Sequence, residues 1–369
     1  MAASSAPSPY IGPERPGRIL IVRPSAFGDV CRTVPVLVSL KRAFPDAKID
    51  WLVQDSFAPA IAHHPDLSRV LLFQRRRLGS WHSPAIAGEL WRFLRALRES
   101  RYDLVLDCQG LARSAFFTWS TRAPTRIGFA NAGELGWLAL TRRVPAPRTI
   151  HAVDRMLKLV EAAGCEAVRD LRLYSSPMDQ SAVARLVGGA GTRYAVFAPT
   201  TRWAGKLWPG ERFAGLAGRL LDDKAFGIEK IAVVGSGAER GQCAELLDLA
   251  TRDARIVDLV GRTSAGELLA LIEGSRLTVG SDSAAIHIAV GFSRPLVALF
   301  GPTLIDLVGP YGRAAHVVQQ IVPGDTLDYK NEAAGRVLMN RITVESVLEC
   351  AFSQVGERTE TLPKATAAV

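Results

Sequence analysis

The sequence lacks the features that mark membrane-spanning and secreted proteins. It has no uninterrupted apolar run of the roughly 18 residues that cross a bilayer. The longest candidate, residues 287–302, is broken by glycine, serine, arginine and proline. Residues 1–17 have neither a basic start nor an apolar stretch, so they do not resemble a signal peptide. We therefore expect a cytoplasmic protein without a membrane span.

Metal-binding patterns are also missing. The five cysteines lie far apart, and none belongs to a Cys-x-x-Cys pair or to a Cys/His spacing typical of zinc. No Asp-x-Asp pair suited to holding a catalytic cation is found. We expect reduced thiols that serve as small core residues, no metal site and no cofactor.

The charge of the chain is concentrated in one half. The net charge is +9, but residues 1–188 hold 26 Lys and Arg against 16 Asp and Glu, a net +10, while residues 189–369 hold 19 against 20, a net −1. A basic half attracts nucleic acid, acidic lipid head groups, or a phosphorylated or carboxylated substrate. The pattern therefore predicts an anionic partner for the first half only.

The pattern of apolar residues predicts two α/β domains. A chain of 369 residues exceeds what one core normally serves. Apolar runs alternate with amphipathic stretches in the rhythm of a parallel sheet, and Pro35 should kink or delay the first helix. Strands are predicted at 18–23, 49–53, 70–73 and 104–108, then at 194–198, 230–234, 255–259, 277–280 and 296–300, with a final helix at 344–352.

We place a first domain at 18–188 and a second domain at 189–355, between disordered tails at 1–17 and 356–369. The connection is expected in the stretch 175–191, which is rich in Ser, Gly and Thr. Two doubly wound, Rossmann-like domains of this kind bind ligands at the carboxyl ends of their strands, across a cleft. This arrangement is typical of an enzyme with two substrates.

One loop of the first half carries a candidate catalytic carboxylate. The segment PSAFGDV follows the first strand and delivers Asp29 to the start of a helix, where ligands of such folds bind. Asp29 is equally well explained as a helix cap, which would lower its pKa and make it a poor base. Gly28 before it indicates a tight turn or the close approach of a ligand.

Two loops of the second half are suited to an anion. The segment TTRWAGKLWP follows the strand at 194–198, and its two hydroxyls and its lysine suit a diphosphate, although a solvated loop is the alternative. The segment GSDSAAIH joins the strand at 277–280 to a helix start, where free amides bind phosphate. Asp282 could instead cap that helix, and His287 could be a partly buried histidine.

Two further segments are ambiguous. The run VVGSGAER imitates a dinucleotide fingerprint, but Arg240 occupies the position of the third glycine, so a dehydrogenase is not indicated. Glu239 could meet a ribose hydroxyl. The run Arg75, Arg76 and Arg77 is either a solvated charge run or part of an acceptor site.

Taken in order, these segments resemble glycosyltransferase family 9, the ADP-heptose:lipopolysaccharide heptosyltransferases, and are most similar to the heptosyltransferase I type. The resemblance covers about residues 18–355. It is carried by ILIVRPSAFGDV, DWLV, DLVLDCQGLARS, RIGF, HAVDR, YAVFAPTTRWAGKLWP, GSDSAAIHIAV and VALFGPT. Ser283-Ala284 stands where the family has Thr-Gly, and Lys206 lies one residue further from the threonines than in the family.

The resemblance implies the GT-B fold, in which the first domain (18–188) binds the acceptor and the second (189–355) binds the nucleotide-sugar. It also implies roles for particular residues. Asp29 is implied as the catalytic base, and Lys206 as the cation that stabilises the leaving diphosphate. The implied donor-binding residues are Thr200, Thr201, Lys206, Glu239, Asp282, Ser283, Ala284 and His287. The candidate acceptor-binding residues are Gly28, Arg75, Arg76, Arg77, Gln109 and Arg126.

The implied reaction is inverting, metal-independent transfer of heptose from an ADP-heptose donor to the anionic Kdo-lipid A inner core of lipopolysaccharide. Peripheral contact with the cytoplasmic face of the inner membrane is expected, and binding of nucleic acid is not. One alternative is another family 9 enzyme, heptosyltransferase II-like or with a different ADP-sugar or acceptor. An alternative from a different class is a nonenzymatic nucleotide- or nucleic-acid-binding protein.

Overall fold

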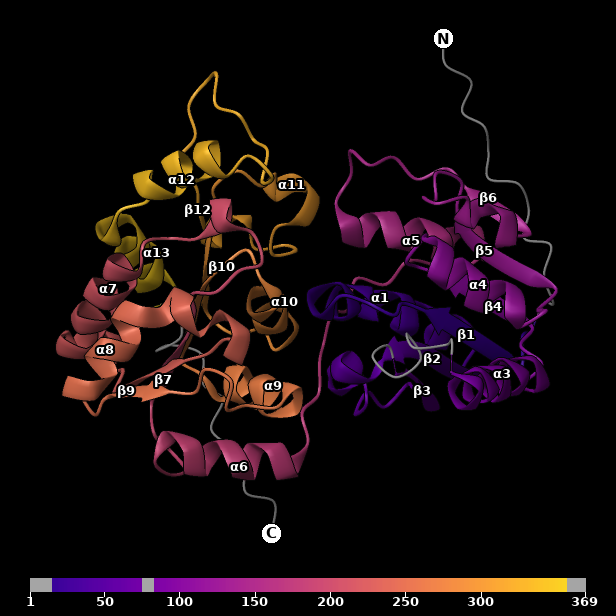
Figure 1. Ribbon diagram of the computed structural model, residues 1–369, viewed down its shortest axis with the longest axis horizontal. Coiled ribbons are helices and arrows are strands. Elements are labelled where there is room, and N and C mark those ends of the chain that lie inside the picture. The colour runs from indigo at the N-terminus through magenta and orange to yellow at the C-terminus, as the bar shows by residue number, and fades with distance from the viewer. Residues whose placement is uncertain (1–14, 75–82, 357–369) are drawn as a thin grey trace. The chain divides into compact units, whose positions relative to one another are not determined.

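The computed structural model describes residues 15–74 and 83–356 (Figure 1). The predicted tails therefore lie almost wholly outside the described residues. The chain divides into two compact units between Tyr174 and Ser175, at the start of the stretch where we expected the connection. Helix α6 (Pro177–Val187) packs against α9 (Ala265–Gly274), so it belongs to the second unit and not, as the boundary at 188 implied, to the first.

The first unit is built on a six-stranded parallel sheet with the order β3-β2-β1-β4-β5-β6. Its strands are β1 (Arg18–Val22), β2 (Lys48–Gln54), β3 (Arg69–Phe73), β4 (Leu104–Asp107), β5 (Thr125–Phe129) and β6 (Arg142–Val144). The first four confirm the predicted strands. β5 and β6 were not predicted, because neither is a purely apolar run.

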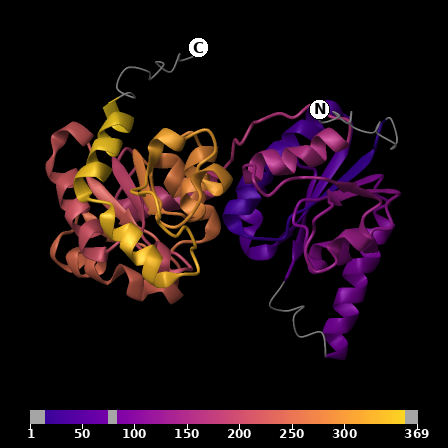
Figure 2. The ribbon, with the colours of Figure 1, turned by 90° about the horizontal axis from the view of Figure 1, so that it is seen from above.

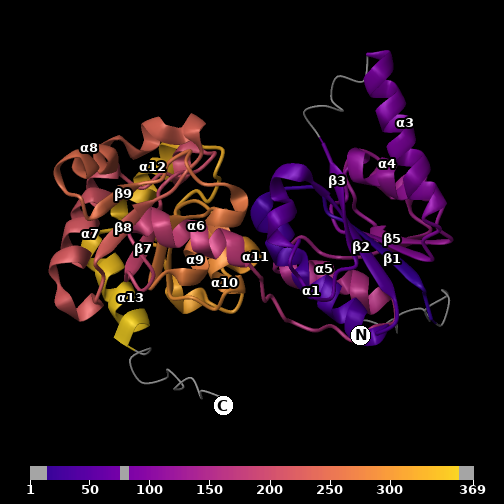
Figure 3. The ribbon, with the colours of Figure 1, turned by 90° about the horizontal axis from the view of Figure 1, so that it is seen from below.

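Helices cover both faces of this sheet (Figure 3). α1 (Phe27–Ala43) and α5 (Ala152–Ala162) pack together on one face, and α3 (Pro84–Glu99) and α4 (Ala112–Ser120) on the other. Short 3-10 turns, η1 (Asp55–Ala60) and η2 (Gly136–Ala139), follow β2 and β5. Pro35 does not delay α1, which begins eight residues before it, at Phe27.

The second unit repeats the design, with the strand order β12-β11-β10-β7-β8-β9, all parallel. Its strands are β7 (Tyr194–Ala198), β8 (Lys230–Val233), β9 (Ile256–Asp258), β10 (Leu277–Ser281), β11 (Leu296–Leu299) and β12 (Val317–Val318). Its other helices are α7 (Gly210–Asp222), α8 (Ala244–Arg252), α10 (Ala284–Gly291), α11 (Ile305–Val308), α12 (Glu332–Arg341) and α13 (Val344–Gly356), with 3-10 turns η3 (Ala204–Lys206), η4 (Lys224–Phe226), η5 (Gly237–Cys243) and η6 (Ala314–His316).

The core of the second unit joins distant segments. Trp208 packs edge-on against Phe213 of α7, with ring centroids 4.8 Å apart, and its indole N–H donates to the carbonyl of Ile342 (2.9 Å). The last helix, α13, contributes Val347, Ala351 and Val355 to the same core, which confirms the final helix and extends it to Gly356. The end of the chain is therefore an integral part of the unit.

Both sheets are sandwiched between helices (Figure 2), and each has one strand at which the chain order reverses. β1 lies between β2 and β4, and β7 lies between β8 and β10. Loops that follow neighbouring strands at such a reversal diverge, and they form the usual ligand crevice of doubly wound folds. Two doubly wound parallel sheets in succession confirm the predicted fold class.

The cysteines agree with the sequence-based expectation of reduced core thiols. All five cysteines are free thiols; four are buried and Cys350 is partly buried. Burial raises the pKa of the Cys31 and Cys108 thiols to about 12. Among the helices in the described part of the chain, none has both the length and the apolar character needed to cross a membrane.

Candidate active site

Asp29 lies in the first turn of α1, just beyond the carboxyl end of β1. Its carboxylate accepts a hydrogen bond from the Ala26 amide (3.3 Å), so it does help to start the helix. It also forms ion pairs with Arg23 (2.9 Å) and with Arg32, one turn further along α1. The Asp29 side chain remains 28% exposed, so a ligand can reach the carboxylate.

The pKa of Asp29 results from opposing effects. Burial favours the neutral acid and would raise the pKa. The charges of Arg23 and Arg32, with hydrogen bonds from Arg32 and the Ala26 amide, outweigh burial and hold the pKa well below its usual range. Asp29 is therefore ionised at neutral pH, where it is a weak base.

A second loop at the same edge holds Gln109. β4 pairs with β1, and Val22 lies opposite Asp107, so the loops that follow these two residues are neighbours. The buried Asp107 carboxylate accepts hydrogen bonds from the amides of Gln109 (3.0 Å) and Gly110 (2.9 Å) and from the Ser114 hydroxyl (2.9 Å). Gln109 accepts in turn from the Ser25 amide (3.3 Å). Asp29 and Gln109 thus come together.

Sequence reasoning missed three residues that build this edge. Asp107 shapes the loop of Gln109, while Arg23 and Arg32 hold the carboxylate of Asp29. Signals for all three were present: a carboxylate that ends a buried strand, and two arginines at the strand end and one helical turn from Asp29. Arg23 also donates to the carbonyl of Cys108 and so connects the two loops.

Of the other acceptor candidates, one lies at this edge and one lies away from it. Gly28 lies beside Asp29 in the first turn of α1. Arg126 is the second residue of β5, near the end of the sheet where strands begin, and its guanidinium donates to the carbonyls of Ala139 (2.7 Å) and Ala123 (2.5 Å). The structure therefore does not bring Arg126 to the edge that carries Asp29. Residues 75–77 lie outside the described residues.

In the second unit, the loop after β7 carries three of the candidate donor residues. Thr200 and Thr201 are almost fully buried, and the Thr201 amide donates to the side chain of Gln242 (3.0 Å). Lys206 ends the 3-10 turn η3, which packs against α12. A Cβ on Gly205 would lie 3.2 Å from the Cα of Glu332, so only glycine fits comfortably at this approach.

Lys206 forms the central ion pair of the candidate donor site. Its ammonium lies 2.6 Å from the carboxylate of Asp282, and both side chains are only about a tenth exposed. The ammonium also lies 4.8 Å from the centre of the Tyr329 ring. Asp282 thus holds the lysine in place and does not cap α10. Tyr329 gave no recognisable signal in the sequence.

The start of α10 provides donors beside this ion pair. Ser283 is the N-cap residue, Ala284 is the first helical residue, and His287 is buried one turn further on. The first amides of a helix have no intrahelical acceptor and carry its positive dipole end. The buried hydroxyls of Ser281, Ser283 and Thr303 have no hydrogen-bond partner within residues 15–74 and 83–356. This edge is therefore rich in unused donors.

Glu239 lies beside the threonine loop. Its Oε2 accepts from the Ser236 hydroxyl (2.7 Å), the Ser236 amide (3.1 Å) and the Thr200 hydroxyl (3.2 Å). No described residue donates to its other oxygen, Oε1. A Cβ on Gly235 would come within 2.8 Å of the Thr200 side chain, so glycine allows the two loops to meet. A 3-10 turn follows β8, which agrees with the failed dinucleotide fingerprint.

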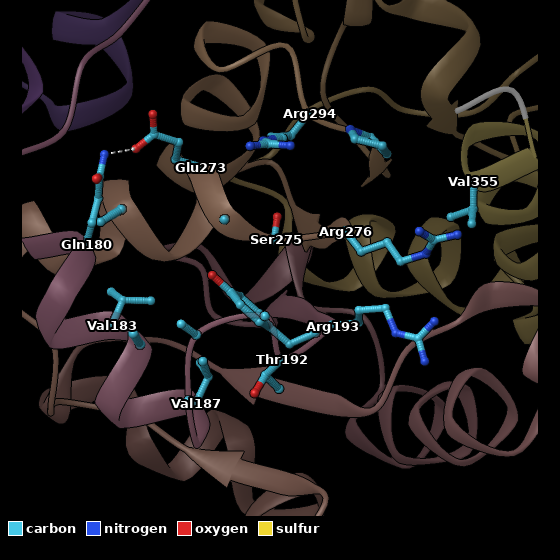
Figure 4. Close-up of a pocket in the computed structure, with 18 residues that line it drawn as sticks. Gln180, Val183, Val187, Thr192, Arg193, Glu273, Ser275, Arg276, Arg294 and Val355 are labelled. Atoms are coloured by element: carbon cyan, nitrogen blue, oxygen red, sulfur yellow. Dashed lines mark hydrogen bonds between the residues drawn. The ribbon is translucent and has the colours of Figure 1, made fainter. Parts of the chain in front are cut away.

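A cavity of about 540 Å³ opens at the opposite edge of the second sheet, where its strands begin (Figure 4). Its walls include Arg193, Arg276 and Arg294. Arg193 and Arg276 directly precede β7 and β10, and Arg294 lies shortly before β11. None of the candidate donor residues lines it. The donor site is assigned to the other edge, because the free helix amides and the threonine and lysine loops lie there.

The described residues contain no group of three or more His, Cys, Asp or Glu that could hold a metal ion. The positive groups of the candidate donor site are instead the Lys206 ammonium and the amides at the start of α10.

Comparison with known proteins identifies the family. The profile of glycosyltransferase family 9 (heptosyltransferase) matches residues 90–334. The chain belongs to glycosyltransferase family 9. It is 32% identical over 303 residues to lipopolysaccharide heptosyltransferase 1 of Pseudomonas aeruginosa, covering 80% of this chain and 82% of that protein. It is 30% identical to lipopolysaccharide heptosyltransferase 1 of Escherichia coli K12, covering 80% of this chain and 91% of that protein.

Solved structures agree with this family 9 assignment. The structure of E. coli heptosyltransferase WaaC with ADP matches with a TM-score of 0.69 and 28% identity, over 88% of this chain and 99% of that one. E. coli ADP-heptose lps heptosyltransferase II matches with a TM-score of 0.74 at 23% identity, over 93% and 99%, which supports the GT-B fold. This chain is thus a GT-B glycosyltransferase.

Proposed function

We propose that this family 9 glycosyltransferase transfers heptose from ADP-heptose to the Kdo-lipid A inner core of lipopolysaccharide. One observation carries the donor assignment: a largely buried lysine, Lys206, held by Asp282 beside the start of α10. An ammonium and free helix amides together match the two phosphates of a nucleotide diphosphate. The relatives named heptosyltransferase 1 are 29–32% identical to this chain, against 25–27% for heptosyltransferases 2 and 3, which favours the first type.

The proposed chemistry divides between the two units. Asp29 accepts the proton of the acceptor hydroxyl as that oxygen attacks the anomeric carbon of the sugar. The bond from the anomeric carbon to the diphosphate breaks, and Lys206 and the α10 amides stabilise the departing negative charge. Attack on the face opposite the leaving group inverts the anomeric carbon. A β-configured donor therefore gives an α-linked heptose.

A weak base is adequate for this reaction. Glycosyl transfer passes through a transition state with oxocarbenium character. The attacking hydroxyl becomes strongly acidic only as its bond to that carbon forms, so even a carboxylate with a lowered pKa can take the proton. Thr200, Thr201 and Glu239 are proposed to bind the nucleoside and phosphates, with Oε1 of Glu239 accepting from a ribose hydroxyl.

Turnover of a panel of nucleotide-sugars tests the proposal. ADP-heptose with Kdo-lipid A is expected to be the best pair, with a new α-linked heptose in the product by NMR. Preference for another ADP-sugar, or for an acceptor that already carries heptose, would favour the alternative of another family 9 activity. Transfer from no ADP-sugar would contradict the proposal.

We predict that transfer does not require a divalent cation. Lys206 and the α10 amides supply the positive charge that a metal ion supplies in other glycosyltransferases. Activity measured in excess EDTA is therefore expected to equal that without chelator. Loss of activity in EDTA, with recovery on adding magnesium or manganese, would show that the reaction needs a metal.

The low pKa of Asp29 predicts the pH dependence of the reaction. Only the ionised carboxylate accepts a proton, so the rate falls as the pH drops below this pKa. Because Arg23 and Arg32 lower the pKa, kcat/KM should show no decline attributable to Asp29 between about pH 7.5 and pH 5.5. Arg32→Gln leaves burial less compensated and is expected to raise the pKa of Asp29, so the acid limb of its profile should lie at higher pH than that of the wild type.

Arg32→Lys is the matched control, because it keeps a positive charge beside Asp29. It should leave the profile close to that of the wild type. Profiles that are identical for Arg32→Gln and the wild type would show that the arginine does not set the ionisation of the base.

A further inference from the structure

Two neighbouring segments of the first unit expose large apolar side chains. Helix α4 packs against η2, and a shallow cavity of about 280 Å³ lies between them. On α4, Phe116 and Trp119 are 43% and 44% exposed; on the η2 segment, Leu135 and Leu138 are 64% and 61% exposed. We call this surface the α4–η2 patch, which consists of Leu111, Phe116, Trp119, Leu135 and Leu138.

The backbone holds this patch in a costly conformation. Glu134 and Leu135 have φ angles of +53° and +57°, a left-handed region that non-glycine residues rarely adopt. Two such residues in succession cost free energy, and here they keep a leucine in solvent. The Glu134 carboxylate accepts from the Ala112 amide at the start of α4 (3.0 Å), which fixes the segment to the helix. Core packing does not explain an arrangement that exposes apolar surface.

Two arginines flank the apolar centre. The guanidinium of Arg122 lies 3.9 Å from the centre of the Trp119 ring, and that of Arg143 lies 4.3 Å from the centre of the Trp137 ring. Apolar and aromatic groups flanked by guanidinium groups are typical of protein surfaces at the boundary between lipid and water.

The patch also borders the loop that carries Gln109. Leu111 lies two residues after Gln109, and the Gly133 amide of the η2 segment donates to the carbonyl of Gly110 (2.9 Å). The patch therefore begins at the edge of the sheet that carries Asp29. An acceptor anchored in a lipid layer under this patch would present its sugars at that edge.

We propose that the α4–η2 patch binds the protein to an anionic membrane surface. Phe116, Trp119 and the leucines enter the headgroup region, and the arginines pair with lipid phosphates. Charge decides between this occupant and a second copy of the chain. A symmetric dimer through the patch would place like-charged arginines opposite one another, whereas an anionic surface complements them. The proposal rests on a lipid-anchored acceptor, as in the proposed function.

Vesicle flotation with the full-length protein, without donor or acceptor, tests the proposal. The wild type should bind vesicles of phosphatidylcholine and phosphatidylglycerol, bind those of phosphatidylcholine alone more weakly, and lose affinity as salt is added. The double substitution Phe116→Ser with Trp119→Ser should lower the affinity for anionic vesicles by at least about tenfold. Trp91→Ser is the matched control, because Trp91 is an exposed tryptophan with an arginine beside it on α3.

Two further measurements keep the outcomes distinct. A second double substitution, Leu135→Asp with Leu138→Asp, should also lose vesicle binding, and thermal unfolding should show that each variant folds. Transfer to a soluble acceptor without acyl chains should be unchanged in both. The proposal would be overturned if both double variants bound anionic vesicles as tightly as the wild type. It would also be overturned if the wild type formed a dimer that only the patch variants dissociate. Vesicle binding without heptose transfer would instead contradict the proposed function alone.

Discussion

Replacing Asp29 by alanine is expected to lower kcat for heptose transfer by about 10²- to 10⁴-fold, the usual contribution of a general base. The carboxylate is the proposed acceptor of the hydroxyl proton, and no other described carboxylate shares its place at the end of β1. Binding of ADP should be unchanged, because the proposed ADP contacts all belong to the second unit. Rate measurements at saturating substrates and calorimetry with ADP check the two halves of this prediction.

Two variants control for structural effects at Asp29. Asp29→Asn keeps the shape of the side chain, so it should also be inactive while leaving α1 intact. Asp55→Asn removes an exposed carboxylate that directly follows β2, and it should leave activity unchanged. Near-normal turnover by Asp29→Ala would show that Asp29 only caps α1 and binds its two arginines.

Replacing Lys206 by alanine is expected to weaken ADP binding by about tenfold to a hundredfold, which corresponds to the loss of one charge-assisted hydrogen bond. It should also lower kcat, because negative charge on the diphosphate grows as the glycosidic bond breaks. Lys206→Arg should restore only part of the loss, since a planar guanidinium does not reproduce a compact ammonium. Calorimetry with ADP and steady-state kinetics give the two quantities.

The single Lys206 variant leaves the largely buried Asp282 without its partner, which destabilises a protein. The double variant Lys206→Ala with Asp282→Asn removes both charges, so it should recover thermal stability but not ADP affinity. Lys330→Ala removes a charge from an exposed side chain next to Tyr329 and should change neither. If Lys206→Ala binds ADP as tightly as the wild type, the lysine is not part of the donor site.

The sequence predicted most of the fold because buried parallel strands are nearly continuous apolar runs. β1 (RILIV) and β7 (YAVFA) follow this rule. β5 (TRIGF) and β6 (RRV) do not, because β5 contains an arginine and a glycine and β6 is a short edge strand with two arginines. Pro35 was expected to kink or delay the first helix, yet α1 begins at Phe27 and continues through it.

The sequence also predicted only part of the candidate site. Local patterns placed Asp29 and the start of α10 at the ends of strands, because strand, turn and helix follow one another directly in the sequence. The pairing of Lys206 with Asp282 was not predictable, since these residues are 76 positions apart and meet only because β7 and β10 are neighbours. Sequence reasoning also left Asp282 as a possible helix cap, but the N-cap residue of α10 is Ser283, and Asp282 pairs with Lys206.

The close approach of η3 to α12 has a consequence for attempts to transplant the donor loop. A Cβ on Gly335 of α12 would come within 2.8 Å of three backbone atoms of Gly205, so the two segments lie backbone against backbone. The position of Lys206 is therefore set by a helix more than a hundred residues later in the chain. A chimaera that borrows residues 199–206 alone would carry the lysine without the surface that aligns it. Residues 199–206 and α12 would therefore have to be exchanged together.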